Sequence, residues 1–185
     1  SLSVFGVPDV SILEIIEVPH PILSKRAREV RADEFGDDLA AHLSDMAETM
    51  YAAPGVGLAA PQVADPRRIL VIDPGFEGET GESQKGRELH KMVNPRITEK
   101  SRDTIIWEES CLSVPEMSIE MRRHKKITVT WQDAHGAVQE RVFEDFPAVV
   151  FQHELDHLEG VTLLDKSSRL KRSRYLKRQK KLRQG

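Results

Sequence analysis

Apolar residues recur at helical spacing in two parts of the chain. Leu39, Leu43, Met46 and Met50 lie on one face, which predicts a helix over 33–50 capped by Asp33. A second helix is expected from Pro147, which suits a first helical turn, to about 158. From Ser168 onward a third, C-terminal helix is expected, with few apolar residues among many charged ones.

Alternating apolar and polar residues predict strands between these helices. Ile127, Val129 and Trp131 alternate with threonines, followed by a turn over 133–136 and a return strand over 138–143. Shorter extended segments are expected at 12–18, 69–72, 92–93 and 104–107, a surface loop at 74–87, and core positions for Trp107 and Trp131. The pattern predicts an α+β fold, with antiparallel or mixed sheets around a central helix over 147–158.

The composition is that of a globular protein. Of 185 residues, 39% are hydrophobic and 31% are charged, enough for one domain with its own core. No apolar run reaches the roughly 20 residues of a membrane helix, and residues 1–10 lack the pattern of a signal peptide. The single cysteine, Cys111, excludes an internal disulfide, so we expect a cytoplasmic protein that does not bind membranes.

The charge is unevenly distributed. Residues 166–185 contain ten Lys and Arg and no acidic residue, so their net charge of +10 leaves −13 for residues 1–165. We therefore predict a single catalytic domain over 1–165 and a basic tail over 166–185. The tail is either a solvated surface helix or a segment that binds phosphates.

The segment His153-Glu154-Leu155-Asp156-His157 carries the strongest chemical signal. Residues four apart share one face of a helix, so His153 and His157 can bind one metal ion. Glu154 lies beside them and can accept a proton from a water molecule on that ion. The third ligand is open at this point, because Asp165 downstream and the thiol of Cys111 upstream are both candidates.

Another segment, from Gly55 to Gln62, reads Gly-Val-Gly-Leu-Ala-Ala-Pro-Gln. Its glycines permit close approach of other groups, and Gln62 offers an amide donor. Together with Glu109-Ser110-Cys111-Leu112-Ser113 and the two-histidine segment, it resembles the peptide deformylases. In that family a G-x-G-L-A-A-x-Q segment precedes E-G-C-L-S and then H-E-x-D-H, and here all three occur in this order.

The resemblance implies an enzyme that removes the N-formyl group from the initiator methionine of new polypeptides and releases formate. By similarity, Cys111, His153 and His157 bind one divalent metal, Fe²⁺ in cells, with Ni²⁺, Co²⁺ or Zn²⁺ possible in a purified sample. Glu154 is then the general base, and the Gln62 side chain and the Leu112 backbone N–H stabilise the oxyanion.

The substrate-binding residues are expected around this centre. The implied contacts to the peptide backbone come from Gly55, Val56, Gly57, Glu109 and Ser110. The methionine side chain is expected against Val149 and Val150, one turn before His153. Ser110 stands where the family has glycine, and its effect on substrate affinity and loop geometry stays open. The basic tail implies contact with ribosomal RNA, as in some deformylases with a C-terminal helix.

Three rival functions remain at this point. One is a zinc endopeptidase with Asp165 as third ligand. The second is a non-enzymatic RNA-binding protein, which the acidic body disfavours. The third is an inactive relative that still binds metal, a hypothesis that Ser110 motivates.

Overall fold

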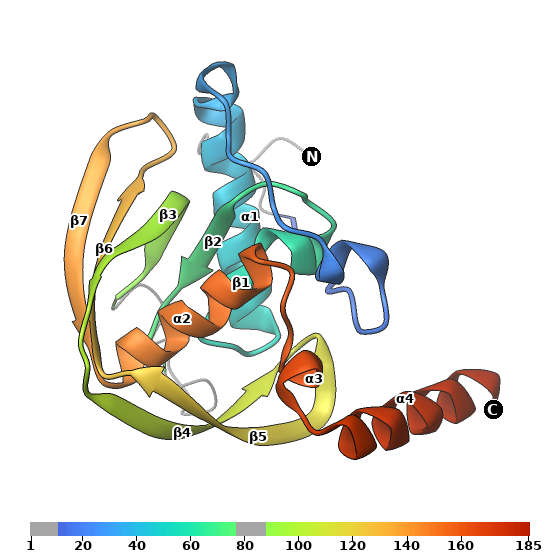
Figure 1. The fold of residues 1–185 in the computed structure, drawn as a ribbon. Helices are drawn as coiled ribbons and strands as arrows, with labels where there is room; N and C mark the ends of the chain where they lie inside the picture. Colours follow the sequence, from blue (N-terminus) through green and yellow to red (C-terminus); the bar gives the residue numbers. More distant parts are fainter. Residues whose placement is uncertain (1–10, 77–87) are drawn as a thin grey trace.

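The structure is a computed structural model that describes residues 11–76 and 88–185 (Figure 1). The loop predicted over 74–87 lies mostly outside the described residues. Within them the architecture is mixed α+β, with antiparallel sheets and four helices.

The larger sheet has five strands in the order β1-β2-β3-β6-β7, and each adjacent pair is antiparallel. The strands are β1 (Gly57–Ala59), β2 (Ile69–Ile72), β3 (His90–Lys100), β6 (Lys126–Gln132) and β7 (Val138–Glu144). The prediction of a strand, a turn and a return strand over 127–143 is confirmed, and Trp131 is buried as expected. β3 is much longer than the predicted strand at 92–93. Asn94 has φ 49° and shifts its register, so simple alternation fails there.

A separate two-stranded sheet contains β4 (Thr104–Cys111) and β5 (Val114–His124). The sequence predicted only the first half of β4 and did not predict β5. One face of this sheet is exposed, and in β5 charged and apolar residues do not alternate regularly. The two-residue period that predicts a strand is therefore missing from its sequence. Trp107 is 38% exposed, so the prediction that it is a core residue is wrong.

The first long helix begins later than predicted. α1 spans Asp37–Ala52, whereas Asp33 belongs to a short 3₁₀ turn over 32–34. Gly36 separates the two with φ 138°, a backbone angle that a residue with a side chain rarely adopts. The predicted cap at Asp33 is therefore wrong, although the apolar face from Leu39 to Met50 is buried as expected.

Helix α2 (Phe146–Leu158) contacts β1 and β2 of the large sheet, and also β5 of the small sheet (Figure 1). Its boundaries match the prediction, with Pro147 in the first turn and Gly160 beyond the end. A Cβ at Gly160 would lie 2.9 Å from backbone atoms of Ser24 and Lys25, which explains the glycine. Phe151 is fully buried in a cluster with residues of the large sheet, so α2 is part of the core of that sheet.

The chain ends in α3 (Leu163–Lys166) and α4 (Arg169–Gln184), which projects beyond the body in Figure 1. Ser168 caps α4 by accepting a hydrogen bond from the backbone N–H of Lys171. Near the start, residues 12–18 form no regular strand, but Ile16 and Val18 donate backbone hydrogen bonds to Gln62 and Ser113. Among the described residues, every helix is too short or too polar to cross a membrane.

Candidate metal centre and active site

Two elements bring one thiol and two imidazoles together. Cys111 is the last residue of β4, and His153 and His157 lie one turn apart on α2. The Cys111 Sγ lies 3.3 Å from the Nε2 of His157, and the ligand atoms of the three residues lie within 4.8 Å of one another. The contact of α2 with the small sheet thus joins segments more than 40 positions apart.

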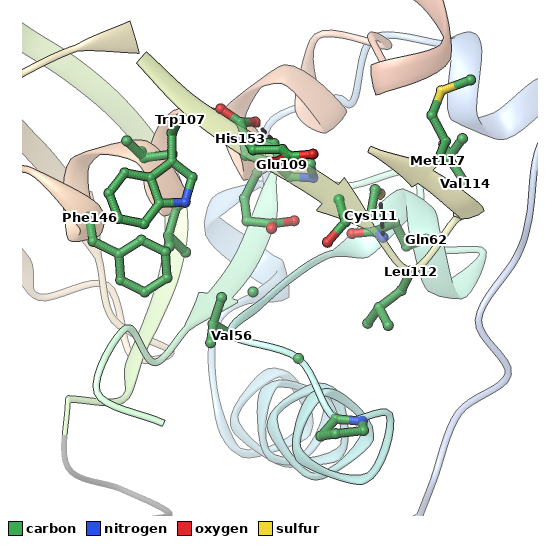
Figure 2. Close-up of a pocket in the computed structure, with 18 of the residues that line it drawn as sticks. Val56, Gln62, Trp107, Glu109, Cys111, Leu112, Val114, Met117, Phe146 and His153 are labelled. Atoms are coloured by element: carbon green, nitrogen blue, oxygen red, sulfur yellow. Dashed lines mark hydrogen bonds and ion pairs between the residues drawn. The ribbon is translucent and has the colours of Figure 1, made fainter. Parts of the chain in front are cut away.

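A chain of charged residues orients His153, and Figure 2 shows its first member, Glu109, beside the imidazole. Its Nδ1 lies 2.9 Å from Glu109 Oε1, and Arg123 donates two hydrogen bonds of 2.8 Å to the same carboxylate. Arg123 also donates to Asp156, at 2.7 Å. Because Glu109 occupies Nδ1, the Nε2 atom of His153 is left to face the thiol side.

The pKa values of the two histidines are shifted in opposite directions. Burial alone would lower the pKa of His153, but hydrogen bonds with Cys111 and Glu109 raise it well above its ordinary value. Burial lowers the pKa of His157 well below its ordinary value, and the charges of His153 and Arg123 add to this. A neutral His157 has a lone pair on Nε2, the form that a metal ligand requires.

Glu154 is buried beside the two histidines, and its Oε1 has no hydrogen-bond partner among the described residues. Burial raises the pKa of this carboxyl to about 7. The close approach requires Gly57 on β1, because a Cβ there would lie 2.9 Å from Cγ and Cδ of Glu154. An unpartnered carboxylate with this pKa can exchange a proton near neutral pH.

The amide of Gln62 has a fixed orientation. Its Oε1 accepts a hydrogen bond from the Ala59 backbone N–H at 2.9 Å, so the NH₂ group must point the other way. That group donates to Ser113 at 3.0 Å and lies 3.8 Å from Cys111 Sγ. Gln62 therefore presents donors next to the thiol.

A cavity of about 440 Å³ is lined by Gln62, Cys111, His153 and Glu154 (Figure 2). Besides them, its lining includes all seven residues predicted to bind substrate: Gly55, Val56, Gly57, Glu109, Ser110, Val149 and Val150. The sequence did not identify Trp107 and Phe146, whose stacked rings (5.1 Å between centroids) form one end of the cavity. Trp107 lies on β4 and Phe146 on α2, far apart in sequence, so no local sequence pattern predicts that their rings stack.

Serine at position 110 fits the strand conformation. Ser110 is exposed on β4 and is paired with Ser118. Among the described residues, positive φ angles outside glycine occur at Ala64, Asn94, Glu116 and Asp145 and not here. The backbone at 110 therefore adopts a φ angle that a residue with a side chain tolerates.

Asp165, the other candidate ligand, lies elsewhere. Its Oδ2 accepts a hydrogen bond from the Thr162 backbone N–H at 2.9 Å, and its Oδ1 lies 3.6 Å from Arg172. Asp165 is not among the residues grouped with the two histidines. Its contacts instead cap the short helix α3.

The three grouped side chains fit a divalent cation. An ion about 2.3 Å from a sulfur and about 2.0 Å from a nitrogen, in tetrahedral geometry, separates the two ligands by roughly 3.5 Å. The observed distance between Cys111 and His157 is 3.3 Å. A thiolate with two imidazoles suits several first-row metals.

The chain is similar to known proteins over nearly its whole length. A family model described as polypeptide deformylase matches residues 12–173. Peptide deformylase from Novosphingobium aromaticivorans is 44% identical over 186 residues, and the match covers 94% of this chain and 98% of that protein. Peptide deformylase from Erythrobacter litoralis is 42% identical over 191 residues, with the same coverage of both chains.

Solved structures agree with these relatives. The crystal structure of a peptide deformylase from Legionella pneumophila has a TM-score of 0.80 and 35% identity, covering 94% of this chain and 96% of that one. Both the sequence and the fold therefore support the same assignment. The chain belongs to the polypeptide deformylase family, metal-dependent hydrolases that remove the N-formyl group from the N-terminus of newly made polypeptides.

Proposed function

We propose that Cys111, His153 and His157 bind one divalent cation, and that the protein uses it to hydrolyse the formyl group of formyl-methionine peptides. The observation that carries this proposal is the convergence of three ligand atoms within 4.8 Å of one another, with Cys111 and His153 lining the cavity. Glu154 also lines it, and its Oε1 has no hydrogen-bond partner among the described residues. A bound divalent cation would act as a Lewis acid that lowers the pKa of a water molecule and polarises the formyl oxygen.

Glu154 is the proposed general base and then general acid. Its carboxylate takes a proton from the attacking water and delivers it to the amine that leaves. A pKa of about 7 suits both steps, since a catalytic group works best when its pKa is near the operating pH. Gly57 leaves room for the carboxylate to stay at this position.

The negative charge that develops on the formyl oxygen needs donors fixed in advance. We assign this role to the Gln62 amide, whose orientation Ala59 fixes, and to the backbone N–H of Leu112 beside Cys111. The amide of Gln62 would exchange its bond with Ser113 for one with the substrate.

We assign the peptide backbone to the cavity edges formed by 55–57 and 109–110, where main-chain groups can pair with an extended chain. The methionine side chain is assigned to the apolar end, against Val149 and Val150 of α2. Trp107 and Phe146 extend this surface. Aromatic rings give favourable contacts to a thioether sulfur.

The identity of the metal and the location of the protein are also proposals. We expect Fe²⁺ in cells and Ni²⁺, Co²⁺ or Zn²⁺ after purification in their presence. The donor set does not discriminate among these ions. We expect the protein to work in the cytoplasm, where formylated chains leave the ribosome.

The basic residues of α4 are proposed to contact ribosomal RNA, and residues 166–185 to act as an arm distinct from the catalytic domain over 1–165. Several of them are exposed, among them Arg174, Lys177 and Lys181. Replacing these three by Gln should weaken ribosome binding and reduce its dependence on salt concentration. Unchanged affinity and salt dependence would refute this role.

The proposed chemistry is tested by formate release from a formyl-Met tripeptide under anaerobic conditions, with metal analysis of the same sample. The wild type should release formate and contain metal. Glu154→Gln should keep its metal and lose at least about 10²-fold in kcat, because the proton acceptor is gone. Near-normal turnover by metal-loaded Glu154→Gln would refute the role of Glu154.

A further inference from the structure

The β4–β5 hairpin contains a bulge beside the cavity. Ser110 and Cys111 are consecutive on β4, yet they pair with Ser118 and Val114 on β5. Residues 115–117, here called the β5 bulge, therefore have no partner in the ladder of the hairpin. Glu116 at its centre has φ 63°, an unfavourable angle for a residue with a side chain. Such a conformation persists only where surrounding contacts maintain it.

One face of α4 supplies these contacts. Tyr175 donates its hydroxyl hydrogen to the Pro115 carbonyl at 2.8 Å, and Arg178 donates to the Glu116 carboxylate at 2.8 Å. Lys171 donates to the Ser118 carbonyl, at 3.1 Å, just after the bulge. Lys171, Tyr175 and Arg178 are spaced by four and three residues, so they lie on the same face of the helix.

The β5 bulge in turn lines the cavity. Glu116 and Met117 are among the lining residues, together with Leu112 and Val114 of the hairpin. Figure 2 places Val114 and Met117 at the end of the cavity opposite Trp107 and Phe146, with Cys111 between the two ends. With the methionine side chain at the aromatic end, the other end remains for the peptide residues that follow it.

We propose that Tyr175 and Arg178 of α4 are positioning residues that fix the β5 bulge as the wall for the peptide residues after the formyl-methionine. The inference rests on the proposed function and adds a role of the C-terminal helix in substrate binding. The side-chain hydrogen bonds and ion pairs given for Tyr175 and Arg178 go to Pro115 and Glu116, and not to the metal ligands or Glu154. We therefore expect the two residues to affect binding of the peptide and not the chemical step.

The two contacts of Tyr175 and Arg178 are weak enough that losing them should change the KM only modestly. The Arg178–Glu116 pair is exposed (66% and 62% of the two side chains), and exposed ion pairs contribute little on their own. Tyr175 is 9% exposed, and its part-buried hydrogen bond is partly shielded from water. Loss of both contacts should raise the KM for longer peptides by about fivefold, the effect of one ordinary hydrogen bond.

The test uses Tyr175→Phe/Arg178→Gln in the full chain. Lys180→Gln is the control, because it removes one positive charge from the exposed part of the same helix. Kinetics are measured with formyl-Met amide and with a formyl-Met tetrapeptide, and circular dichroism checks that α4 stays helical. We expect a higher KM for the tetrapeptide alone, an unchanged kcat, and wild-type values for Lys180→Gln.

A second variant tests the ion pair directly. Glu116→Arg/Arg178→Glu exchanges the two charges and should recover a KM that Arg178→Glu alone raises. An unchanged tetrapeptide KM in the first double variant, or an equal rise with formyl-Met amide, would overturn the proposal. Absence of formate release from the wild type would instead refute the proposed function, so the two failures are distinguishable.

Discussion

At the scale of single residues, the proposed centre depends on hydrogen bonds that fix the orientations of the His153 ring and the Gln62 amide. Glu109 occupies one nitrogen of His153, and Ala59 fixes which end of the Gln62 amide faces the thiol. Gly57 is the least tolerant of these positions, because the space a side chain would need already contains Glu154. The Glu154 carboxylate can therefore occupy its position only if residue 57 has no side chain.

Gly57→Ala should therefore reduce kcat by about 10²-fold, since a displaced general base loses its alignment with the substrate. Metal content should stay normal. Gly55→Ala is the matched control, because its Cβ would meet the movable end of the Leu112 side chain at 3.0 Å, and the loss should be smaller. Wild-type kcat for metal-loaded Gly57→Ala would contradict the proposed position of Glu154.

Residue types and local spacing predicted much of the centre. The two histidines, Glu154 and the thiol were identifiable because metal chemistry restricts which side chains can serve. Arg123 was not identifiable, since it lies among other basic residues (Arg122, Lys125 and Lys126) and no local pattern distinguishes it from them. Its role comes from the packing of β5 against α2, which brings it to both Glu109 and Asp156.

At the scale of elements, α2 determines where the histidines lie, and its C-terminal end is fixed by a buried arginine. Arg68 donates hydrogen bonds to the carbonyls of Ala27 and Leu158 and forms a 2.6 Å ion pair with Glu159. Arg26 contacts the same Glu159 from the exposed side, at 3.3 Å. Arg68 and Arg26 thus both bind Glu159, but the Arg68 side chain is buried and the Arg26 side chain is exposed.

Arg68→Ala should lower the free energy of unfolding by about 1–3 kcal/mol, because buried carbonyls lose a charged donor. Arg26→Ala should leave it unchanged within about 0.5 kcal/mol, as expected for an exposed pair. Urea denaturation followed by circular dichroism measures both. Equal losses for the two variants would show that burial of Arg68 has no special effect.

The elements differ in how well sequence predicts them. The boundaries of α2 follow from Pro147 and Gly160, and the strands over 127–143 follow from strict alternation. β5 escaped prediction because one of its faces is exposed, and the start of α1 was misplaced because a 3₁₀ turn precedes it. The topology that places the small sheet against α2 depends on long-range contacts, which no local pattern encodes.

At the scale of the whole molecule, a charge cluster joins three distant segments. Asp65 lies 2.9 Å from His42 of α1 and 2.9 Å from Arg67, which in turn contacts Glu34 near the start of the chain. Burial alone would raise the pKa of Asp65, but hydrogen bonds from His42 and Arg67 outweigh it and lower the pKa. Hydrogen bonding to Arg28 lowers the pKa of Glu34 to about 2.

A carboxylate whose pKa is lowered by folding stabilises the folded state above its unfolded pKa, about 4 for Asp. This stabilisation is lost as the pH falls toward the folded value. Asp65→Asn should therefore cost about 1–3 kcal/mol at pH 7, and the difference from wild type should shrink below about pH 4. Urea unfolding at pH 7 and pH 3 measures this, with the exposed Asp103→Asn as control. A constant difference at both values would contradict the assignment.

The proposed metal centre is tested most directly by metal content together with formate release in anaerobically prepared Cys111→Ala, His157→Ala and Asp165→Asn. The wild type and Asp165→Asn should contain about one metal ion per chain and release formate. Cys111→Ala and His157→Ala should lose the metal and the activity together. A Cys111→Ala protein that retains one metal ion and normal formate release would contradict the proposed centre.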